Sequence, residues 1–215
     1  MSDLTHVEFK SVSRSFGGVP VLRGINARFS SGETTVLMGP NGAGKSTLLS
    51  ILGTRLSPTR GEVHFVAGSD PLDKHQVRAQ LGWLSHEPFA YLELSGRANI
   101  ELTLRLHGLD ASHYERIAER VGLGKFAERP LGTMSRGQKQ RVALGRAICN
   151  NPRLLLLDEP WTGLDQDSQK LVERIADESA RAGCILLIVS HEPGTAERLG
   201  ARELVLRGGK LEPTS

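Results

Sequence analysis

The chain has 215 residues, which is enough for one large domain or two small ones and for a substantial buried core. With 39% hydrophobic and 24% charged residues it has an ordinary globular composition, and its net charge of +3 is too small to indicate a nucleic-acid partner. The first ten residues lack the apolar core of a signal peptide, and no stretch approaches a membrane-spanning run of about 18 apolar residues. The cysteines, Cys149 and Cys184, lie in apolar runs, so we expect buried free thiols in a reducing compartment.

The first part of the chain alternates apolar and polar residues over short stretches, as half-buried strands do. An apolar helical pattern over 45–56 interrupts these stretches and stops before Pro58. This part is therefore predicted to be rich in β-structure around one helix. The predicted strands are 4–12, 21–29, 34–38, 61–67 and 81–85.

Beyond residue 86 the apolar spacing becomes helical. It predicts two helices within 95–121, separated at Gly108, and Asp110 or Ser112 can cap the second of them. A third helix is predicted over 135–149. This helical block carries the whole excess of basic over acidic residues, which indicates either solvated helix faces or a face for an anionic membrane surface or an acidic partner.

The last part alternates strands and helices. A strand is predicted over 153–158, because its four consecutive leucines form a continuous apolar run that is typical of a strand buried on both faces in a parallel sheet. The later predicted elements are helix 166–181, strand 184–190, helix 194–199 and a terminal pair over 202–213 that is broken at Gly208-Gly209. Strand alternating with helix predicts a parallel α/β core, which the helical block interrupts as a subdomain.

Residues 35–47 match the phosphate-binding pattern G-x-x-x-x-G-K-[ST] between a predicted strand and a predicted helix. Glycines let the backbone turn its N–H groups inward, and the helix directs its positive end to the same place. Lys45 adds a charge near the β- and γ-phosphates, and Ser46 offers a hydroxyl to Mg²⁺. The chain is therefore predicted to bind a nucleoside triphosphate. The residues expected at the phosphates are Gly39, Asn41, Gly42, Gly44, Lys45, Ser46 and Thr47.

An acidic pair closes the apolar strand that ends at residue 158. Asp158 is placed to reach a Mg²⁺ ion held by Ser46, and Glu159 to orient or deprotonate an attacking water. The alternative is that both carboxylates merely lead the strand into a turn at Pro160. The phosphate-binding loop upstream favours the metal and water roles, because Mg²⁺ must be held on that side.

Residues 133–141 form the third informative stretch. Ser135 and Gln138 fit the capping box S-x-x-Q at a helix start, and Gly137 lies in the first turn. A helix start of this kind is also an anion site. The phosphate-binding loop, this LSGGQ-like stretch, the LLLLDEP strand, Gly163-Leu164-Asp165 and Ser190-His191 follow one another as in ABC-transporter ATPase subunits, which the chain resembles over essentially its whole length.

The resemblance implies an ABC ATPase fold: α/β, a P-loop NTPase core with a parallel sheet, an N-terminal antiparallel β part and an inserted α-helical subdomain. It divides a single domain, 1–215, into a core of 1–86 with 151–215 and a helical subdomain of 87–150. The implied reaction is hydrolysis of ATP with Mg²⁺ as cofactor. The implied partners are a second ATPase subunit in a head-to-tail dimer, expected to be a homodimer, and an integral-membrane permease on whose cytoplasmic face the chain is peripheral.

The resemblance also assigns roles to single residues. Phe16 matches the aromatic side chain that stacks on adenine, although a lone aromatic residue is also compatible with a place in the core. Ser135, Gly137 and Gln138 belong to the segment that contacts ATP bound to the second copy. Asp165 is implied to bridge the copies, and His191 to hold the γ-phosphate and the water. Glu159, His191 and Lys45 are the implied catalytic residues.

Two positions depart from the family pattern. His86 stands where the family has a glutamine that reaches Mg²⁺ and senses the membrane partner, and imidazole is a poor Mg²⁺ ligand. It can act through water, or Glu87 can serve instead. Arg136 stands where glycine is usual, and a cation in the first turn of a helix opposes the helix dipole. We hypothesise that Arg136 contacts nucleotide across the dimer.

The stretch Gly82 to Pro88, with His86 in the glutamine position, is similar to the ATP-binding subunit of the haem exporter of cytochrome c maturation. Small ATPases of multidrug, antibiotic or polysaccharide exporters remain an alternative, as does a soluble ABC ATPase that acts outside transport. A different P-loop enzyme such as a kinase is a third possibility, and Ser135 and His191 count against it.

Overall fold

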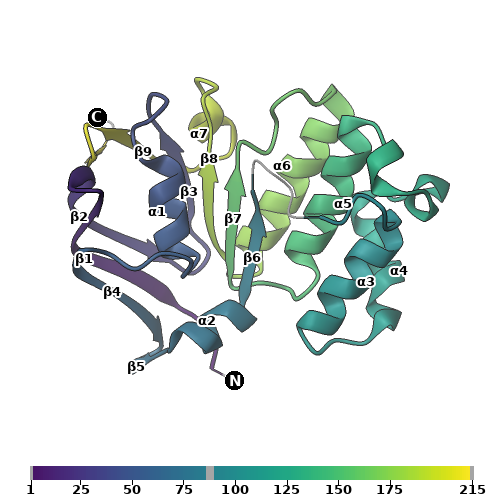
Figure 1. The fold of residues 1–215 in the computed structure, drawn as a ribbon, viewed down its shortest axis with the longest axis horizontal. Coiled ribbons are helices and arrows are strands. Elements are labelled where there is room, and N and C mark those ends of the chain that lie inside the picture. Colours follow the sequence, from purple (N-terminus) through teal and green to yellow (C-terminus); the bar gives the residue numbers. More distant parts are fainter. Residues whose placement is uncertain (1, 86–89, 214–215) are drawn as a thin grey trace.

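The computed structural model describes residues 2–85 and 90–213, whose strands form two sheets (Figure 1). The smaller sheet is antiparallel, with the strand order β2-β1-β4-β5. Val7 and Phe9 of β1 are buried while Glu8 between them is not, as expected for a strand with one face on the core. The strands of this sheet are β1 (His6–Phe16), β2 (Val19–Ser30), β4 (Arg60–Ala67) and β5 (Asp70–Pro71).

The larger sheet has the strand order β10-β9-β3-β8-β7-β6. Its strands pair in parallel, except that β10 is antiparallel to β9, so the sheet is mixed. The predicted α/β class and the N-terminal antiparallel part are both confirmed. The strands are β3 (Thr34–Met38), β6 (Leu81–Leu84), β7 (Leu154–Asp158), β8 (Ile185–Val189), β9 (Arg202–Arg207) and β10 (Lys210–Pro213).

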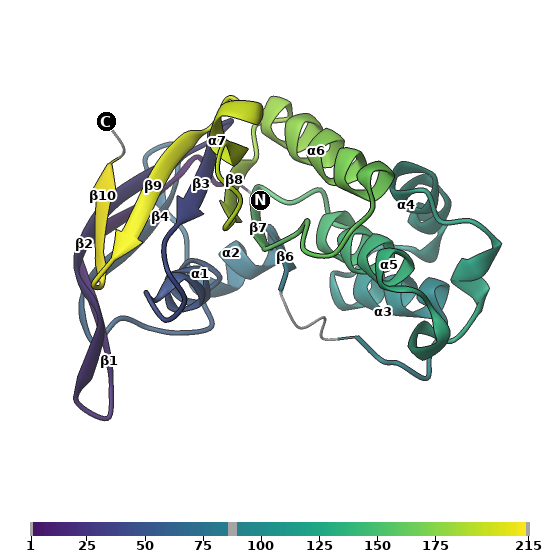
Figure 2. The same cartoon turned by 90° about the horizontal axis from the view of Figure 1, so that it is seen from above.

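The helices occupy separate places around the sheets. Helix α1 lies between the two sheets, where its Leu48 and Leu49 join one cluster with buried residues of β1, β2, β3 and β8. Helices α3, α4 and α5 lie together at the end of the molecule away from the small sheet (Figures 1 and 2). The helices are α1 (Lys45–Leu52), α2 (Lys74–Ala79), α3 (Gly96–Leu106), α4 (Tyr114–Val121), α5 (Arg136–Ile148), α6 (Gln166–Arg181) and α7 (Thr195–Arg198).

A second buried cluster joins the opposite face of the large sheet to α5 and α6, and a third lies within the helical region. Leu155 and Leu157 of β7 belong to the second cluster, while Leu154 and Leu156 belong to the first. Strand β7 is thus buried on both faces, which confirms the interpretation of its continuous apolar run. Cys149 and Cys184 are buried free thiols, as predicted.

The prediction for the first helix was wrong at its end. We predicted helix over 45–56, but α1 ends at Leu52. A Cβ atom on Gly53 would lie 2.4 Å from the Trp83 ring, and Thr54 has a φ of 58°, which is outside the helical region. The chain turns here because β6 packs its tryptophan against the end of the helix.

Helix α2 and the short strand β5 were not predicted. Helix α2 spans six residues and buries a single one, Val77, so it has no apolar period to detect. Its start is nevertheless well defined, since Asp73 and Gln76 form a reciprocal capping box. Asp110 or Ser112 was expected to cap α4, but Asp110 instead caps the short 3₁₀ turn Ala111–His113 before it, where its carboxylate accepts from the backbone N–H of Ser112 at 2.8 Å; α4 itself starts after His113 without a side-chain cap. In the described part of the chain no helix has the length and apolar character needed to cross a membrane.

Candidate functional site

Parallel strands of the large sheet end at a common edge, and the predicted site residues follow them there. The strand pairings place Leu37 of β3 and Asp158 of β7 opposite the same residue of β8, Val189. The segments that continue from these strands therefore emerge side by side. They begin with Gly39, Glu159 and Ser190.

The loop between β3 and α1 adopts a conformation that requires glycine. Gly39 has a φ of 143°, and a Cβ atom there would lie 2.3 Å from the carbonyl oxygen of Leu206. Gly44 has a φ of 106° and is the residue from which α1 starts. The loop thus curls over the N-terminus of α1, where the first helical N–H groups lack partners within the helix.

Lys45 is the first residue of α1, and its side chain reaches back into this loop. Its side chain is only 7% exposed, and its Nζ donates to the carbonyl oxygens of Gly39 at 2.8 Å and Pro40 at 3.1 Å. Burial lowers the pKa of Lys45, and the charges of Glu159 and Asp158 oppose that shift. The ammonium group is thus held by carbonyl dipoles that an anionic phosphate can replace as its partner.

A cavity of about 250 Å³ opens beside the loop. It brings together most of the residues predicted to bind phosphate and metal, namely Asn41, Gly42, Gly44, Lys45, Ser46, Thr47, Asp158 and Glu159, and it adds Val21. The hydroxyl of Ser46 and the carboxylate of Asp158 are oxygen donors of the kind Mg²⁺ prefers. The described residues contain no group of three or more His, Cys, Asp and Glu side chains that could hold a metal. A hydroxyl and a carboxylate on one wall fit Mg²⁺ all the same, because this ion usually keeps waters and substrate phosphates as its other ligands.

Glu159 and His191 meet at this edge of the sheet. The Nε2 atom of His191 lies 2.6 Å from Oε1 of Glu159. Glu159 has a φ of 50°, an unfavourable value for a residue with a side chain, and its N–H donates to the carbonyl oxygen of Val189 at 3.0 Å. The strand end thus fixes the backbone of Glu159 while its carboxylate faces both the cavity and the imidazole.

The LSGGQ-like stretch forms the predicted helix start. The Ser135 hydroxyl accepts from the N–H of Gln138 at 3.3 Å, and the Gln138 side chain accepts from the N–H of Ser135 at 3.1 Å. Ser135, Gly137 and Gln138 are not among the described residues that line the cavity. Helix α5 lies on the far side of β6 and β7 from α1 in both views (Figures 1 and 2). One chain therefore does not bring this helix start to its own phosphate-binding loop.

Arg136 and Asp165 both contact their own chain. A Cβ atom on Gly163 would lie 2.6 Å from Nη1 of Arg136, so the guanidinium group lies directly over the backbone of Gly163. The carboxylate of Asp165 caps α6 by accepting from the N–H of Ser168 at 2.8 Å. This hydrogen bond lowers the pKa of Asp165, and the charge of Arg141 adds to the shift.

Phe16 lies at the end of β1, and its side chain is 44% exposed. The guanidinium group of Arg14 lies 4.6 Å from the centre of its ring. The alternative that Phe16 is a core residue is therefore excluded. An exposed aromatic face at the tip of the β1–β2 hairpin is available for stacking.

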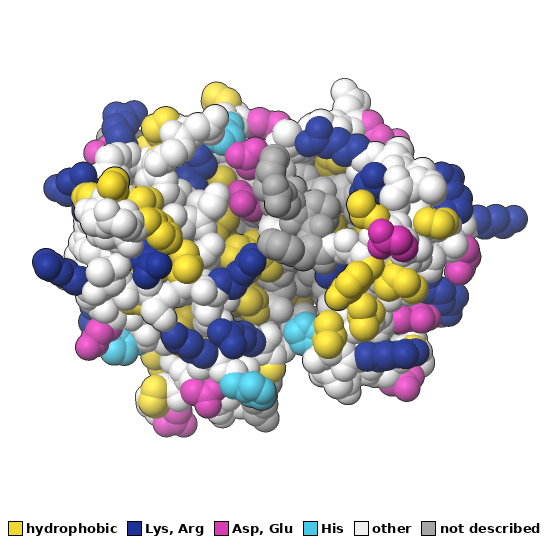
Figure 3. All heavy atoms as spheres, viewed as in Figure 1, with side chains coloured by type: hydrophobic (Ala, Val, Ile, Leu, Met, Phe, Trp, Pro, Cys, Tyr) yellow, Lys and Arg dark blue, Asp and Glu magenta, His cyan; other side chains and the backbone are white. Residues whose placement is uncertain are grey.

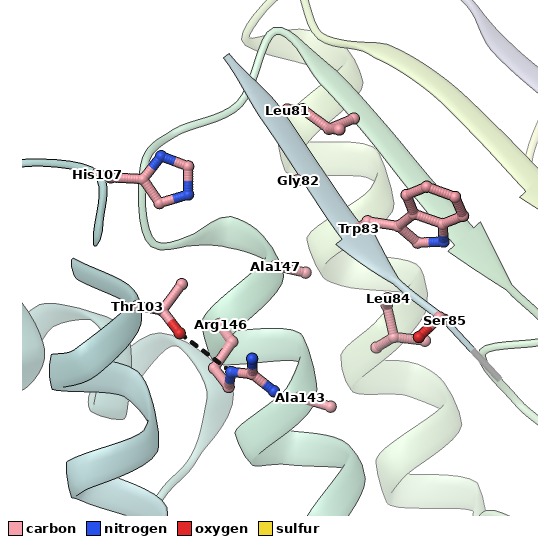
Figure 4. Close-up of a pocket in the computed structure, with 10 residues that line it drawn as sticks. All are labelled: Leu81, Gly82, Trp83, Leu84, Ser85, Thr103, His107, Ala143, Arg146 and Ala147. Atoms are coloured by element: carbon pink, nitrogen blue, oxygen red, sulfur yellow. Dashed lines mark hydrogen bonds between the residues drawn. The ribbon is translucent and has the colours of Figure 1, made fainter. Parts of the chain in front are cut away.

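A second cavity, of about 170 Å³, lies between β6 and the helices α3 and α5 (Figure 4). Arg146 of α5 and Thr103 of α3 face each other across it, and Nε of Arg146 donates to the Thr103 hydroxyl at 3.0 Å. Burial lowers the pKa of Arg146 and of His107, which also lines the cavity. His86 and Glu87, whose roles we left open, lie outside the described residues.

Two residues near Glu159, Gln140 and Thr162, were not predicted from the sequence. Gln140 of α5 donates its side-chain N–H to the carbonyl oxygen of Pro160 at 2.8 Å. The hydroxyl of Thr162 lies 3.5 Å from Oε2 of Glu159. Gln140 shares a helix face with Arg136, one turn earlier, but its contact with Pro160 joins distant segments, so the sequence carried no local signal for it.

Comparison with known proteins gives consistent matches over the whole fold. Residues 22–162 match the family model described as ABC transporter. The chain is 32% identical to the glutamine transport ATP-binding protein GlnQ of Escherichia coli (strain K12), over 95% of this chain and 89% of that protein. It is also 32% identical to the macrolide export ATP-binding/permease protein MacB of Marinobacter nauticus, over 98% of this chain but only 35% of MacB. This chain thus spans about a third of the length of MacB.

Solved structures agree with this match. The dimeric structure of MJ0796, a bacterial ABC transporter cassette, superposes with a TM-score of 0.85 at 28% identity and covers 96% of both chains. A post-hydrolysis structure of MJ0796 bound to ADP and Pi gives a TM-score of 0.84 at 27% identity, over 96% of this chain and 98% of that chain.

Proposed function

The chain belongs to the ABC transporter family, as an ATPase subunit. From this premise we propose that it powers haem export for cytochrome c biogenesis through a separate membrane permease. The observation that carries the ATPase chemistry is the cavity that joins the phosphate-binding loop to Asp158 and Glu159. The observation that favours haem is the sequence Gly82 to Pro88 with His86 in the glutamine position. The general ABC assignment does not depend on the haem proposal.

In the proposed reaction the water attacks the γ-phosphorus in line with the bond to the leaving oxygen of ADP. Glu159 accepts a proton from that water, and His191 hydrogen-bonds to the γ-phosphate, so the two side chains separate to admit both groups. Lys45 exchanges its carbonyl partners for the β- and γ-phosphate oxygens. Ser46 and Asp158 would hold a Mg²⁺ ion, which would supply positive charge that neutralises the phosphates. Phe16 stacks on the adenine ring.

The site is proposed to be completed by a second copy of the chain. The start of α5, with Ser135, Gly137 and Gln138, lies away from the chain's own cavity, and its capping box leaves the remaining first-turn N–H groups for an anion. A head-to-tail dimer presents this start to the γ-phosphate on the partner, with Asp165 near the boundary. The dimeric form of the similar MJ0796 cassette supports this arrangement.

Arg136 is proposed to serve the same boundary. Its guanidinium group lies over Gly163, on the segment that connects Glu159 to Asp165. From there it contacts nucleotide on the partner when the dimer closes. Arg136→Gly is expected to weaken ATP binding or turnover, and unchanged values of both would refute this role.

The permease is proposed to contact the face that carries the second cavity, on the cytoplasmic side of the membrane. Tyr91, Leu92 and Leu94, close to this cavity in sequence, are 58%, 51% and 37% exposed, and adjoining exposed apolar side chains are typical of a protein interface. Figure 3 shows Lys and Arg side chains spread over this face among Asp and Glu side chains. The face therefore suits a partner of mixed polarity.

The ATPase assignment is tested with Glu159→Gln, which keeps the size of the side chain but removes the base. We expect ATP binding to persist while turnover falls at least about 100-fold. Wild-type turnover in this variant would refute the role of Glu159. The cargo is tested by purifying the native complex with its permease and recording its absorption spectrum. A haem spectrum supports the proposal, whereas a bound drug-like or sugar ligand would support the exporter alternative, to which the similarity with MacB also points.

A further inference from the structure

Arg198 connects the segments that follow the two proposed catalytic residues. It is the last residue of α7, the short helix that follows β8 in the chain. Its Nε lies 2.8 Å from Oε1 of Glu173 on α6, and its Nη2 lies 3.5 Å from Oε2 of Glu192. Its guanidinium carbon lies 5.5 Å from the centre of the Trp161 ring.

Two of these contacts involve residues that follow a proposed catalytic residue in the sequence. Trp161 is two residues after Glu159, and Glu192 directly follows His191. Glu173 anchors the same guanidinium group to the body of α6. One side chain thus ties the turn after β7, the turn after β8 and a long helix to one another.

Trp161 gives the turn after Glu159 a rigid attachment. Its side chain is only 2% exposed and packs in the cluster formed by the sheet, α5 and α6. Its buried Nε1 has no hydrogen-bond partner among the described residues, so packing and the cation set its orientation. A displacement of Arg198 would therefore displace the Trp161 ring. Because Trp161 is two residues after Glu159, it would also displace the Glu159 backbone.

The turn after His191 is attached to α7 in a similar way. The buried hydroxyl of Thr195 donates to the carbonyl oxygen of Glu192 at 2.7 Å and lies 3.1 Å from the hydroxyl of Ser190. The N–H of Glu192 donates to the same Ser190 hydroxyl at 3.1 Å. These hydrogen bonds connect residues 190–195 to the start of α7, the helix that carries Arg198.

We propose that Arg198 is a positioning residue that sets the distance between the Glu159 and His191 side chains. It touches neither ATP nor water. It acts through Trp161 on one side and Glu192 on the other. This inference depends on the proposed roles of Glu159 and His191 in hydrolysis.

Arginine is suited to this place and lysine is not. A planar guanidinium group can lie over an indole ring while its N–H groups point to two carboxylates in different directions. A lysine ammonium is a compact point charge on a flexible stem and cannot make all three contacts in a fixed geometry. The lysine variant is therefore expected to keep the charge but lose much of the positioning.

The test uses Arg198→Met, which retains an apolar stem, with Arg181→Met as the matched control. Arg181 also pairs with a carboxylate of α6, Asp177 at 3.0 Å, but it is exposed and touches neither turn. We expect kcat of Arg198→Met to fall about tenfold, because small displacements of reacting groups are costly. The dissociation constant for ATP stays near the wild-type value, and Arg198→Lys has an intermediate kcat. Arg181→Met behaves as wild type.

A double-mutant cycle separates positioning from general stability. In a His191→Ala background, single-turnover measurements should show a smaller fold loss for Arg198→Met, because one of the two positioned groups is already gone. An equal fold loss in both backgrounds, or a wild-type kcat in Arg198→Met, would overturn the inference. If Arg198→Met does not fold, Arg198→Lys decides the question: wild-type kcat there overturns the inference. Failure of the proposed function is recognised separately, because Glu159→Gln would then hydrolyse ATP at the wild-type rate.

Discussion

Nε2 of His191 lies 2.6 Å from Oε1 of Glu159, although the residues are separated by helix α6 and strand β8. The contact arises because β7 and β8 pair in parallel, with Asp158 opposite Val189. The two segments that follow these strands therefore leave the sheet at the same edge. Neighbouring β3 delivers the phosphate-binding loop to that edge. A carboxylate, an imidazole and an anion-binding loop are thus brought together by the order of three strands.

His191→Ala is expected to lower kcat by about 100-fold while leaving the dissociation constant for ATP within about threefold, because its proposed contact develops at the γ-phosphate and the water. The measurement is phosphate release together with nucleotide binding. His75→Ala is the control, since His75 is exposed on α2 and does not line the cavity. Equal loss in both variants would contradict a specific role for His191.

Phe16→Ala is expected to weaken ATP binding about tenfold, because stacking of a base on an aromatic ring is worth about 1–3 kcal/mol. Phe16→Trp should restore binding. Val19→Ala provides the comparison, since Val19 is 65% exposed on the same hairpin but has no ring. If both alanine variants bind ATP as the wild type does, Phe16 does not contact the base.

The helix cap formed by Asp165 can be tested in a single chain, independently of its proposed role between copies. Asp165→Ala removes the acceptor for the Ser168 N–H and should lower the midpoint of thermal unfolding, whereas Asp165→Asn keeps a good cap. Because the folded-state pKa of Asp165 is lowered, the stabilisation is present above the pKa of an unfolded carboxyl group, about 4, and is lost as pH falls through the folded value. Equal midpoints for the alanine variant and the wild type at neutral pH would exclude the cap.

The thiols provide a test of burial. Burial raises the pKa of Cys149 to about 11 and that of Cys184 to about 12. A thiol reagent at pH 8 should therefore label neither cysteine in the native protein and both after unfolding. Because the folded state binds the thiol protons more tightly, these thiols contribute their full stabilisation at pH values below about 8.5, the pKa of an unfolded thiol. This contribution is lost as pH rises toward the pKa values of the folded state. Rapid labelling of the native protein would contradict the packing of α5 and β8.

Elements with a strong apolar period were predicted well from the sequence. The run of leucines in β7 and the amphipathic spacing of α6 each placed an element to within a residue or two. The end of α1 was not predictable in this way, because it depends on Trp83 arriving from a distant strand. Helix α2 buries too little to leave a periodic signal.

In the site, too, features encoded by consecutive residues were predicted from the sequence and features that depend on distant contacts were not. Local motifs identified the loop around Lys45 and the acidic pair at Asp158, because their chemistry lies in consecutive residues. The contact of Gln140 with Pro160 and the position of Arg136 over Gly163 join distant segments, and no local pattern encodes them. The positive φ of Glu159 likewise depends on its bond to β8.

If one chain carries half of each ATP site, two chains must associate to complete the sites, and sedimentation equilibrium of the Glu159→Gln variant measures this association. With ATP and Mg²⁺ the variant should sediment at twice the 23.4 kDa of a single chain, and with ADP at the mass of one. Adding Ser135→Arg should abolish the dimer without preventing ATP binding. A Glu159→Gln chain that binds ATP to saturation and remains at 23.4 kDa would contradict an ATP site shared between two chains.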